Sequence, residues 1–230
     1  MSSEMRLRRI NYRQLTLFMG IGLAGLLLWF TPVILPFKIF VVFLHETFHA
    51  LAAVATGGRV LEMQVSIWQS GYVKSSGGVS VIVASAGYVG SAVFGGLLLI
   101  LAARDDLAQA LFGVLAALFA IVTLLFVRNA FGLFFGLGAT ALFALLAWKN
   151  PPYSAYFVDV LAVLSSLYAI YDLADFLLYG GPTDATILAA VTHVPATIWA
   201  ILWTVISFVV VFASFRVAVR AKPPAAGAPS

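Results

Sequence analysis

Residues 38–56 read KIFVVFLHETFHALAAVAT, a mostly apolar run that contains two histidines and one glutamate. A membrane-spanning helix needs about 20 predominantly apolar residues, and this run has nearly that length. A charged side chain in the middle of such a span costs roughly 3 kcal/mol on insertion scales, so ionisable residues there mark functional sites. The stretch therefore predicts a transmembrane helix that carries a polar site.

The composition of the whole chain also places it in a lipid bilayer. Of its 230 residues, 63% are hydrophobic and 10% are charged, and the mean hydropathy is +1.05. Soluble domains are about half apolar and a quarter charged, so this chain lacks the polar surface that water requires. The net charge of +4 comes from basic residues beside apolar runs, which favours membrane topology over nucleic-acid binding. The absence of cysteine excludes disulfides and thiolate metal ligands.

Further apolar runs predict an all-α polytopic membrane protein with about six or seven transmembrane helices. The candidate spans are 15–35, 38–56, 84–103, 107–127, 130–148, 154–178 and 196–215. Residues 1–14 form a basic segment that is expected in the cytoplasm, residues 15–216 a membrane-embedded domain, and residues 217–230 a disordered tail. Seven spans would place the basic residues after the last span outside, so either two segments do not span or this end departs from the positive-inside rule. The basic start without a clean cleavage site suits a bacterial-type inner membrane.

Residues 57–85 do not have the pattern of a helix. Apolar and polar residues alternate from Val60 to Ser66, and glycine pairs flank the segment. This pattern predicts a β-hairpin over about residues 59–83, between the second and third spans. Because open sheet edges are not tolerated against lipid, the hairpin must lie at the interface or among the helices.

The polar site in the second span has the pattern HExxH, from His45 through Glu46 to His49. Residues four apart share one face of a helix, so both imidazoles can bind one zinc ion. Zinc lowers the pKa of a bound water molecule, and Glu46 stands where it can accept the proton. Helix packing through mutual hydrogen bonds is the alternative, but packing does not require this ordered triplet.

A catalytic zinc ion needs a third protein ligand. The candidates are His193, Asp159, Asp172, Asp175 and Asp184. Asp172 is the first choice, because it lies at a similar depth to His49 if the second and sixth spans run in the same direction. Asp184 is the alternative: it follows Thr183, a typical N-cap, so the helix dipole already explains it, but a re-entrant segment could bring it to the metal. His193 beside Pro195 is better explained as a structural histidine.

Several other residues have structural interpretations. Gly87, Gly90, Gly95 and Gly96 predict close packing of the third span, with lining of an active-site path as the alternative. Trp68, Trp148, Trp199 and Trp203 are expected at the membrane interface or facing lipid. Asn129 marks a span boundary, from which it could hydrogen-bond within the bundle.

Three stretches together resemble the site-2 protease family of intramembrane zinc metalloproteases, in its compact branch without a PDZ domain. They are FLHETFHALAAVATGG at residues 43–58, SAGYVGSAVFGG at 85–96 and LYAIYDLADFLLYGGPTDATILA at 167–189. The resemblance implies that His45 and His49 are zinc ligands, that Glu46 is the general base and that the hairpin binds substrate by strand addition. Better-known members take the third ligand from a Leu-Asp-Gly motif. This chain has no such motif, which leaves Asp172 and Asp184 open.

The predicted function is therefore intramembrane proteolysis, in which metal-activated water hydrolyses peptide bonds of a transmembrane protein substrate. The alternative is a catalytically inactive family member that acts as a membrane scaffold or chaperone, a possibility that the missing motif raises. A zinc transporter fits less well, because its sites would follow a path through the membrane, whereas these histidines form one cluster. The expected partners are the substrate and the lipid bilayer, without nucleic acid, and the oligomeric state is left open.

Overall fold

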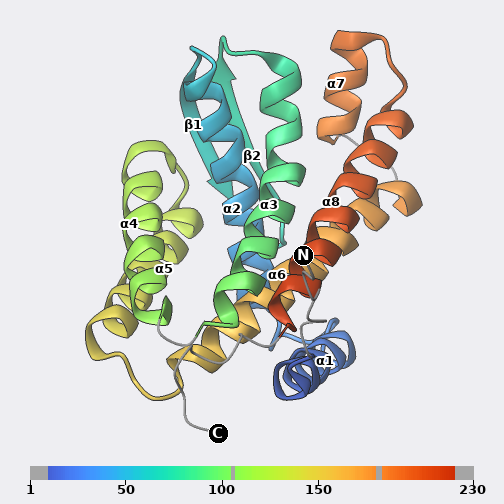
Figure 1. Cartoon of the computed structure of the whole chain (residues 1–230). Coiled ribbons are helices and arrows are strands. Elements are labelled where there is room, and N and C mark those ends of the chain that lie inside the picture. Colours follow the sequence, from blue (N-terminus) through green and yellow to red (C-terminus); the bar gives the residue numbers. More distant parts are fainter. Residues whose placement is uncertain (1–9, 105–106, 180–182, 221–230) are drawn as a thin grey trace, which may run out of the picture.

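The computed structural model describes residues 10–104, 107–179 and 183–220, and of residues 172–179 it describes the backbone alone. Figure 1 shows helices and one hairpin in these residues. The helices are α1 (Tyr12–Leu27), α2 (Leu35–Ala55), α3 (Ser80–Ala102), α4 (Ala108–Phe126), α5 (Ala130–Lys149), α6 (Ser154–Tyr179), α7 (Asp184–Thr192) and α8 (Ala196–Ala218). The strands are β1 (Arg59–Val65) and β2 (Gly71–Ser76), which pair antiparallel between α2 and α3. The predicted fold class is confirmed.

Within the described residues, six helices are long and apolar enough to cross a membrane: α2, α3, α4, α5, α6 and α8. The first predicted span, residues 15–35, is wrong. Helix α1 has 16 residues and ends at Leu27, which gives it a length of about 24 Å against a hydrocarbon core of about 30 Å. Pro32 lies between α1 and α2 and prevents one continuous helix, whereas Pro36 occupies the first turn of α2, where proline is tolerated. Helix α1 instead crosses the lower end of the bundle in Figure 1, where it packs against α6.

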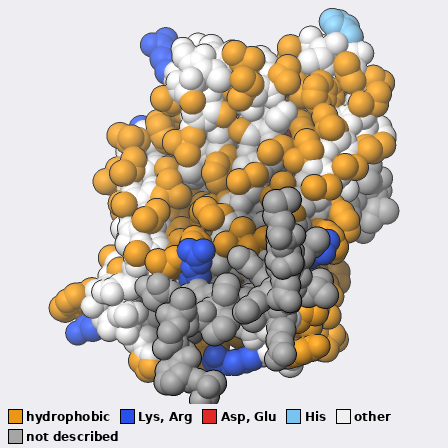
Figure 2. Space-filling model, in the orientation of Figure 1, with side chains coloured by type: hydrophobic (Ala, Val, Ile, Leu, Met, Phe, Trp, Pro, Cys, Tyr) orange, Lys and Arg blue, Asp and Glu red, His pale blue; other side chains and the backbone are white. Residues whose placement is uncertain are grey.

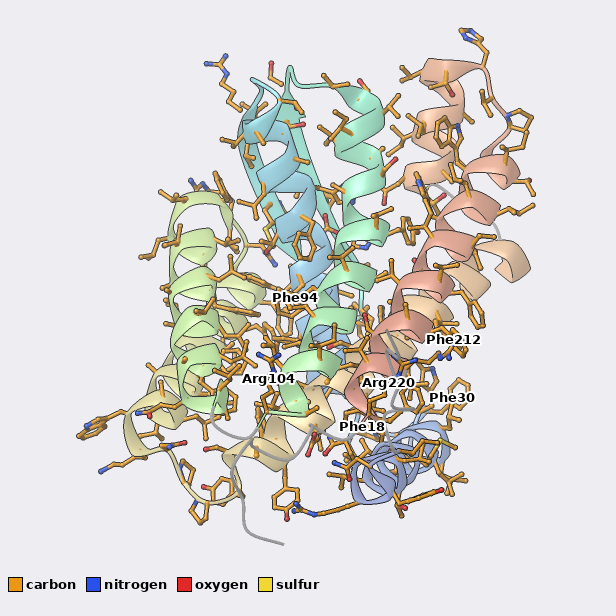
Figure 3. The ribbon with its side chains drawn as sticks, in the orientation of Figure 1. Phe18, Phe30, Phe94, Arg104, Phe212 and Arg220 are labelled. Carbon is orange, nitrogen blue, oxygen red and sulfur yellow. The ribbon has the colours of Figure 1, made fainter. Side chains whose placement is uncertain are left out.

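The two ends of the described chain lie together. The N–H of Asn11 donates to the carbonyl of Val219 at 2.7 Å, and Ile10 forms an antiparallel bridge with Arg220. Figure 3 places Arg220 and Arg104 at the same lower end of the bundle. Six spans return the chain to the side on which they began, so these arginines lie on one side, as the positive-inside rule requires. The conflict that seven spans would create therefore does not arise.

The β-hairpin is shorter than predicted, because it ends at Ser76 and α3 already begins at Ser80. Gly77 and Gly78 turn the chain with φ values of 76° and 84°, a left-handed conformation that glycine adopts without strain. The hairpin packs against α2, and one register shift lies between Val60 and Glu62. Met63 and Val65 of β1 are buried, whereas every residue of β2 is exposed or only partly buried, so the helices enclose the hairpin on the β1 side alone.

Aromatic rings fill the contact between α2 and the α4–α5 pair. The Phe43 and Phe119 rings stack with centroids 4.3 Å apart, and Phe143 meets Phe119 edge to face. On the outside, Figure 2 shows hydrophobic side chains spread over the part of this face that is not grey, with Lys and Arg at its upper corner and in its lower part. This apolar surface is the one that a bilayer would cover.

The glycines of α3 pack closely against other helices, as predicted. A Cβ atom at Gly90 would lie 2.5 Å from Phe48 of α2, and one at Gly95 would lie 3.2 Å from the Ser166 hydroxyl of α6. Gly96 approaches Ser214 of α8 in the same way. Small residues let neighbouring backbones come together where hydrophobic collapse gives no driving force. Helix α3 is therefore the central contact between α2, α6 and α8.

Candidate metal centre

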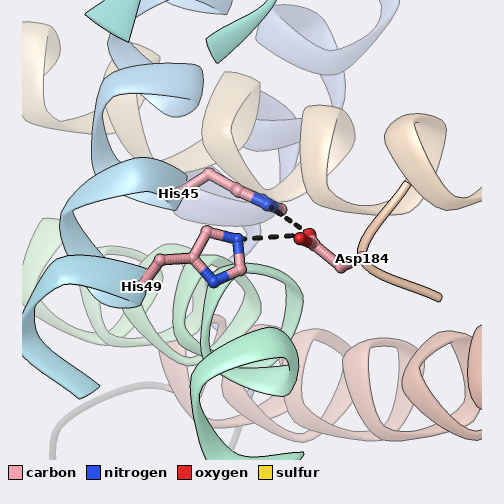
Figure 4. Close-up of side chains that lie close together, drawn as sticks. All are labelled: His45, His49 and Asp184. Carbon is pink, nitrogen blue, oxygen red and sulfur yellow. Dashed lines mark hydrogen bonds and ion pairs between the residues drawn. The ribbon is translucent and has the colours of Figure 1, made fainter. Parts of the chain in front are cut away.

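Three ligand-type side chains converge where α2 meets the start of α7. His45 and His49 are one turn apart on α2, and their ring centroids are 4.7 Å apart. Each Nε2 atom lies 3.1 Å from Oδ2 of Asp184, as Figure 4 shows. All three ligand atoms lie within 4.8 Å of one another, so the group could hold a metal ion.

Local capping places Asp184 at this point. Thr183 is the N-cap of α7: its hydroxyl accepts a hydrogen bond from the N–H of Thr186, and the Thr186 hydroxyl accepts one from the N–H of Thr183. The predicted N-cap is confirmed. Ala185 and Leu188 bury the inner side of α7 against α3 and α8. The carboxylate therefore begins a fixed helix, whose dipole favours its negative charge.

The distances from Asp184 to the two histidines are compatible with ligands of one metal ion. Two ligands that are each about 2.0–2.1 Å from a tetrahedral zinc ion lie about 3.3 Å apart, close to the 3.1 Å that separates each histidine nitrogen from Oδ2 of Asp184. Nδ1 of His49 lies 2.6 Å from the carbonyl oxygen of Val83, so it must donate its proton there. Nε2 of a neutral His49 ring is then unprotonated and turned toward Asp184, as in a histidine that binds metal through Nε2. Without a metal, the contact with Asp184 would require a second proton on this ring.

The charge of Asp184 also suits a ligand. Burial raises the pKa of its carboxyl group, but in the metal-free site hydrogen bonds donated by His45 and His49, together with the charges of their protonated rings, outweigh burial and hold this pKa below its ordinary value. Asp184 is therefore an anion at neutral pH.

The surroundings of the group are closely packed on the α3 side. A methyl group at Gly87 would overlap the Nε2 atoms of both histidines. Tyr88 meets His45 edge to face, and Trp203 of α8 stacks on Tyr88 with centroids 5.0 Å apart. Trp203 is 1% exposed and donates to the Ser85 hydroxyl, so its predicted position at the interface or facing lipid is wrong. The indole instead packs on Tyr88, which in turn contacts His45.

Glu46 lies beside the histidines, on the side of the hairpin. It is buried, yet it lines the same cavity of about 810 Å³ as both histidines, Asp184 and strand β2. A Cβ atom at Gly71 would lie 2.7 Å from Cγ of Glu46. Gly71 thus lets the strand approach the carboxylate, and no pattern in the sequence signals this role.

The remaining candidate ligands lie elsewhere or are not described. The side chains of Asp172 and Asp175 are outside the described residues, so the choice of Asp172 stays a prediction. Asp159 is buried and accepts a hydrogen bond from Gln14 of α1 at 2.9 Å. His193 is exposed and ends α7 with a left-handed backbone. Among the described side chains, the three that come together are His45, His49 and Asp184, the alternative third ligand.

The fold and this site define a class: an integral, multi-pass membrane protein with a candidate metal centre on an HExxH helix. The chain belongs to the Peptidase M50B-like family, whose model matches residues 18–214. This match confirms the resemblance to site-2 proteases without a PDZ domain and identifies a family of membrane metalloproteases. No curated protein and no solved structure matched the chain.

Proposed function

We propose that the protein is an intramembrane zinc metalloprotease that hydrolyses peptide bonds of membrane-tethered protein substrates. In this proposal His45, His49 and Asp184 hold the zinc ion and Glu46 is the general base. The observation that carries the proposal is the convergence of the three ligand atoms beside Glu46, in a cavity that a β-strand also lines. The kind of membrane, bacterial-type and inner, stays a prediction.

Each residue has a chemical task in this reaction. A bound zinc ion would supply Lewis acidity, which polarises the scissile carbonyl and makes water a stronger acid. Glu46 accepts the proton of the attacking water and then delivers it to the leaving amine. Asp184 supplies a negative charge, and the carbonyl of Val83 holds the imidazole of His49 in the tautomer that binds metal. No covalent intermediate with the protein is required.

The hairpin indicates how the substrate binds. A helical transmembrane segment hides its amides in its own hydrogen bonds, so it must unwind before hydrolysis. Strand β2 lines the cavity from Gly71 to Ser75, beside Glu46. An unwound substrate segment can add to this strand and have its lost backbone hydrogen bonds replaced. The proposed product is a protein fragment released from the membrane.

The experiment that tests this function compares Glu46→Gln with the wild type in proteoliposomes that contain single-span reporter proteins. We expect hydrolysis to fall at least about 100-fold, because the general base is lost, while zinc per chain is unchanged. Gln109→Ala is the control, since the Gln109 amide bonds the carbonyl of Ala147 at the end of the α4–α5 pair away from the hairpin. It should hydrolyse as the wild type does.

A scaffold or chaperone predicts a different result. It should tolerate the nearly isosteric change at Glu46, so cells carrying Glu46→Gln should resemble wild-type cells and not cells that lack the protein. Full proteolysis by Glu46→Gln would overturn the assignment of the general base.

A further inference from the structure

The loop between α4 and α5 runs along the outer edge of strand β1. Val127 forms a parallel bridge with Met63, and the N–H of Arg128 donates to the carbonyl of Met63 at 3.0 Å. The carboxamide of Asn129 then bonds both peptide groups of Val65: its Nδ2 donates to the carbonyl at 2.7 Å, and its Oδ1 accepts from the N–H at 3.2 Å. The prediction that Asn129 hydrogen-bonds within the bundle is confirmed.

Two features of α5 favour this contact over ordinary helix capping. Asn129 is the N-cap residue of α5, where asparagine usually accepts a bond from its own first turn, but its side chain makes no capping bond in this described turn. One turn later, a Cβ atom at Gly132 would lie 2.6 Å from Oδ1 of Asn129. The carboxamide thus reaches Val65 instead of its own helix, in a space that Gly132 leaves open.

The register of the hairpin connects this contact with the metal centre. Val65 pairs with Gly71, and the N–H of Ser66 donates to Ser70 at 2.8 Å in the adjoining turn. Hydrogen-bonded and non-hydrogen-bonded pairs alternate in an antiparallel ladder. Val65 and Gly71 therefore form a non-hydrogen-bonded pair, whose peptide groups point outward on both edges. Those of Val65 face Asn129, and those of Gly71 face the cavity.

We propose that the α4–α5 loop, Val127–Asn129, closes the β1 edge and holds the hairpin against Glu46, and that Asn129 is a positioning residue. This inference rests on the proposed function. Asn129 acts through Val65 and its partner Gly71, where an added Cβ atom would overlap the Glu46 side chain. With β1 closed here, the β2 edge at Gly71 and Val73 receives the substrate backbone. The loop thereby fixes both the general base and the strand that the substrate meets.

The test uses the full-length protein and four variants. Asn129→Ala removes both bonds to Val65, Asn129→Asp keeps only the acceptor, and Gly132→Ala leaves Asn129 in place but displaces its carboxamide. Gln109→Ala is the matched control, because the Gln109 amide also links α4 to α5, through the carbonyl of Ala147 at the opposite end of the pair. The readouts are hydrogen–deuterium exchange of peptides covering residues 62–73, zinc per chain, and kcat and KM on the reporter.

We expect exchange in the hairpin to rise at least about tenfold in Asn129→Ala and Gly132→Ala, less in Asn129→Asp and not in Gln109→Ala. The variants with the fastest hairpin exchange should have the lowest kcat. We expect kcat to fall about 10- to 100-fold with unchanged zinc per chain, because a displacement of about 1 Å slows catalysis by that much. A role only in stability would instead lower zinc content and folded yield together and leave the kcat of the folded fraction unchanged.

Two outcomes overturn the inference: unchanged hairpin exchange in both Asn129→Ala and Gly132→Ala, or faster exchange with wild-type kcat. A wild type that hydrolyses nothing would instead overturn the proposed function. Hydrogen–deuterium exchange would then still decide whether the loop holds the hairpin. Failure of this inference can therefore be distinguished from failure of the proposed function. If Asn129→Ala does not fold, Asn129→Asp and Gly132→Ala supply the same comparison.

Discussion

Gly87 of α3 lies so close to His45 of α2 that a single methyl group on Gly87 would overlap Nε2 of the imidazole. The same methyl group would overlap Nε2 of His49. The two nitrogens that would bind the metal therefore depend on a glycine of another helix. The absence of a side chain at this position is required both for the close contact between α2 and α3 and for the metal site. Gly87 therefore combines close helix packing with a place beside the active site, the two interpretations that its sequence context allows.

Gly87→Ala should therefore abolish zinc binding. The added methyl group pushes apart α2 and α3 or turns the imidazoles away, and a zinc site tolerates only small changes in ligand position. We expect zinc per purified chain, measured by elemental mass spectrometry, to fall below about one tenth of the wild-type value. Gly113→Ala is the control, because outside the adjacent residues and the nearby backbone of α4 no described atom lies within 4 Å of the Cβ position there. Stoichiometric zinc in folded Gly87→Ala would contradict this geometry.

The third ligand can be assigned by comparing Asp184→Asn with Asp172→Asn. In Asp184→Asn the new amide keeps the size of the carboxylate but lacks its charge, so zinc affinity should fall at least about 100-fold. Asp172→Asn should retain zinc. Competition with a chelator of known affinity measures both variants. Loss of zinc in Asp172→Asn alone would restore Asp172, the first choice from the sequence, as the ligand.

Much of the fold could be predicted because apolar length is a local property. Six of the predicted spans agree with helices of the structure, and the hairpin between α2 and α3 follows from period-two alternation. The error at α1 has a physical reason, since hydropathy does not distinguish a helix that crosses the bilayer from a short one that lies across the bundle. Pro32 carries the information that this helix does not continue into α2.

The site was only partly accessible to sequence reasoning, for a related reason. His45, Glu46 and His49 lie within five residues, so helix periodicity predicts their common position. Asp184 is separated from His45 by 139 residues, and only the packing of α7 against α3 and α8 brings them together. The support from Trp203 likewise arises between distant helices, so a tryptophan in an apolar segment gave no sign of it.

Zinc affinity should fall as the pH is lowered, because protons compete with the metal for its ligands. Asp184 has a pKa below its ordinary value, so its contribution to folding is complete above about pH 4 and is lost only as the pH falls further. The two histidines must likewise be unprotonated at Nε2 to bind zinc. Two histidine ligands predict a loss of up to about 100-fold per pH unit. Zinc titrations at fixed pH values measure this slope, and an affinity that stays constant to pH 4 would contradict a site with two histidine ligands.

The six-span topology predicts that both described ends of the chain face the same side of the membrane. The chain has no cysteine, so single cysteines can be introduced without background labelling. Tyr12→Cys and Arg220→Cys should react with a membrane-impermeant thiol reagent from one side of sealed vesicles, because residues 10–11 pair with residues 219–220. His193→Cys should react from the other side, since α8 separates His193 from Arg220. If α1 spanned the membrane as a seventh helix, Tyr12 and Arg220 would be labelled from opposite sides. That result would also separate two segments that the structure joins by a hydrogen bond of 2.7 Å between Asn11 and Val219.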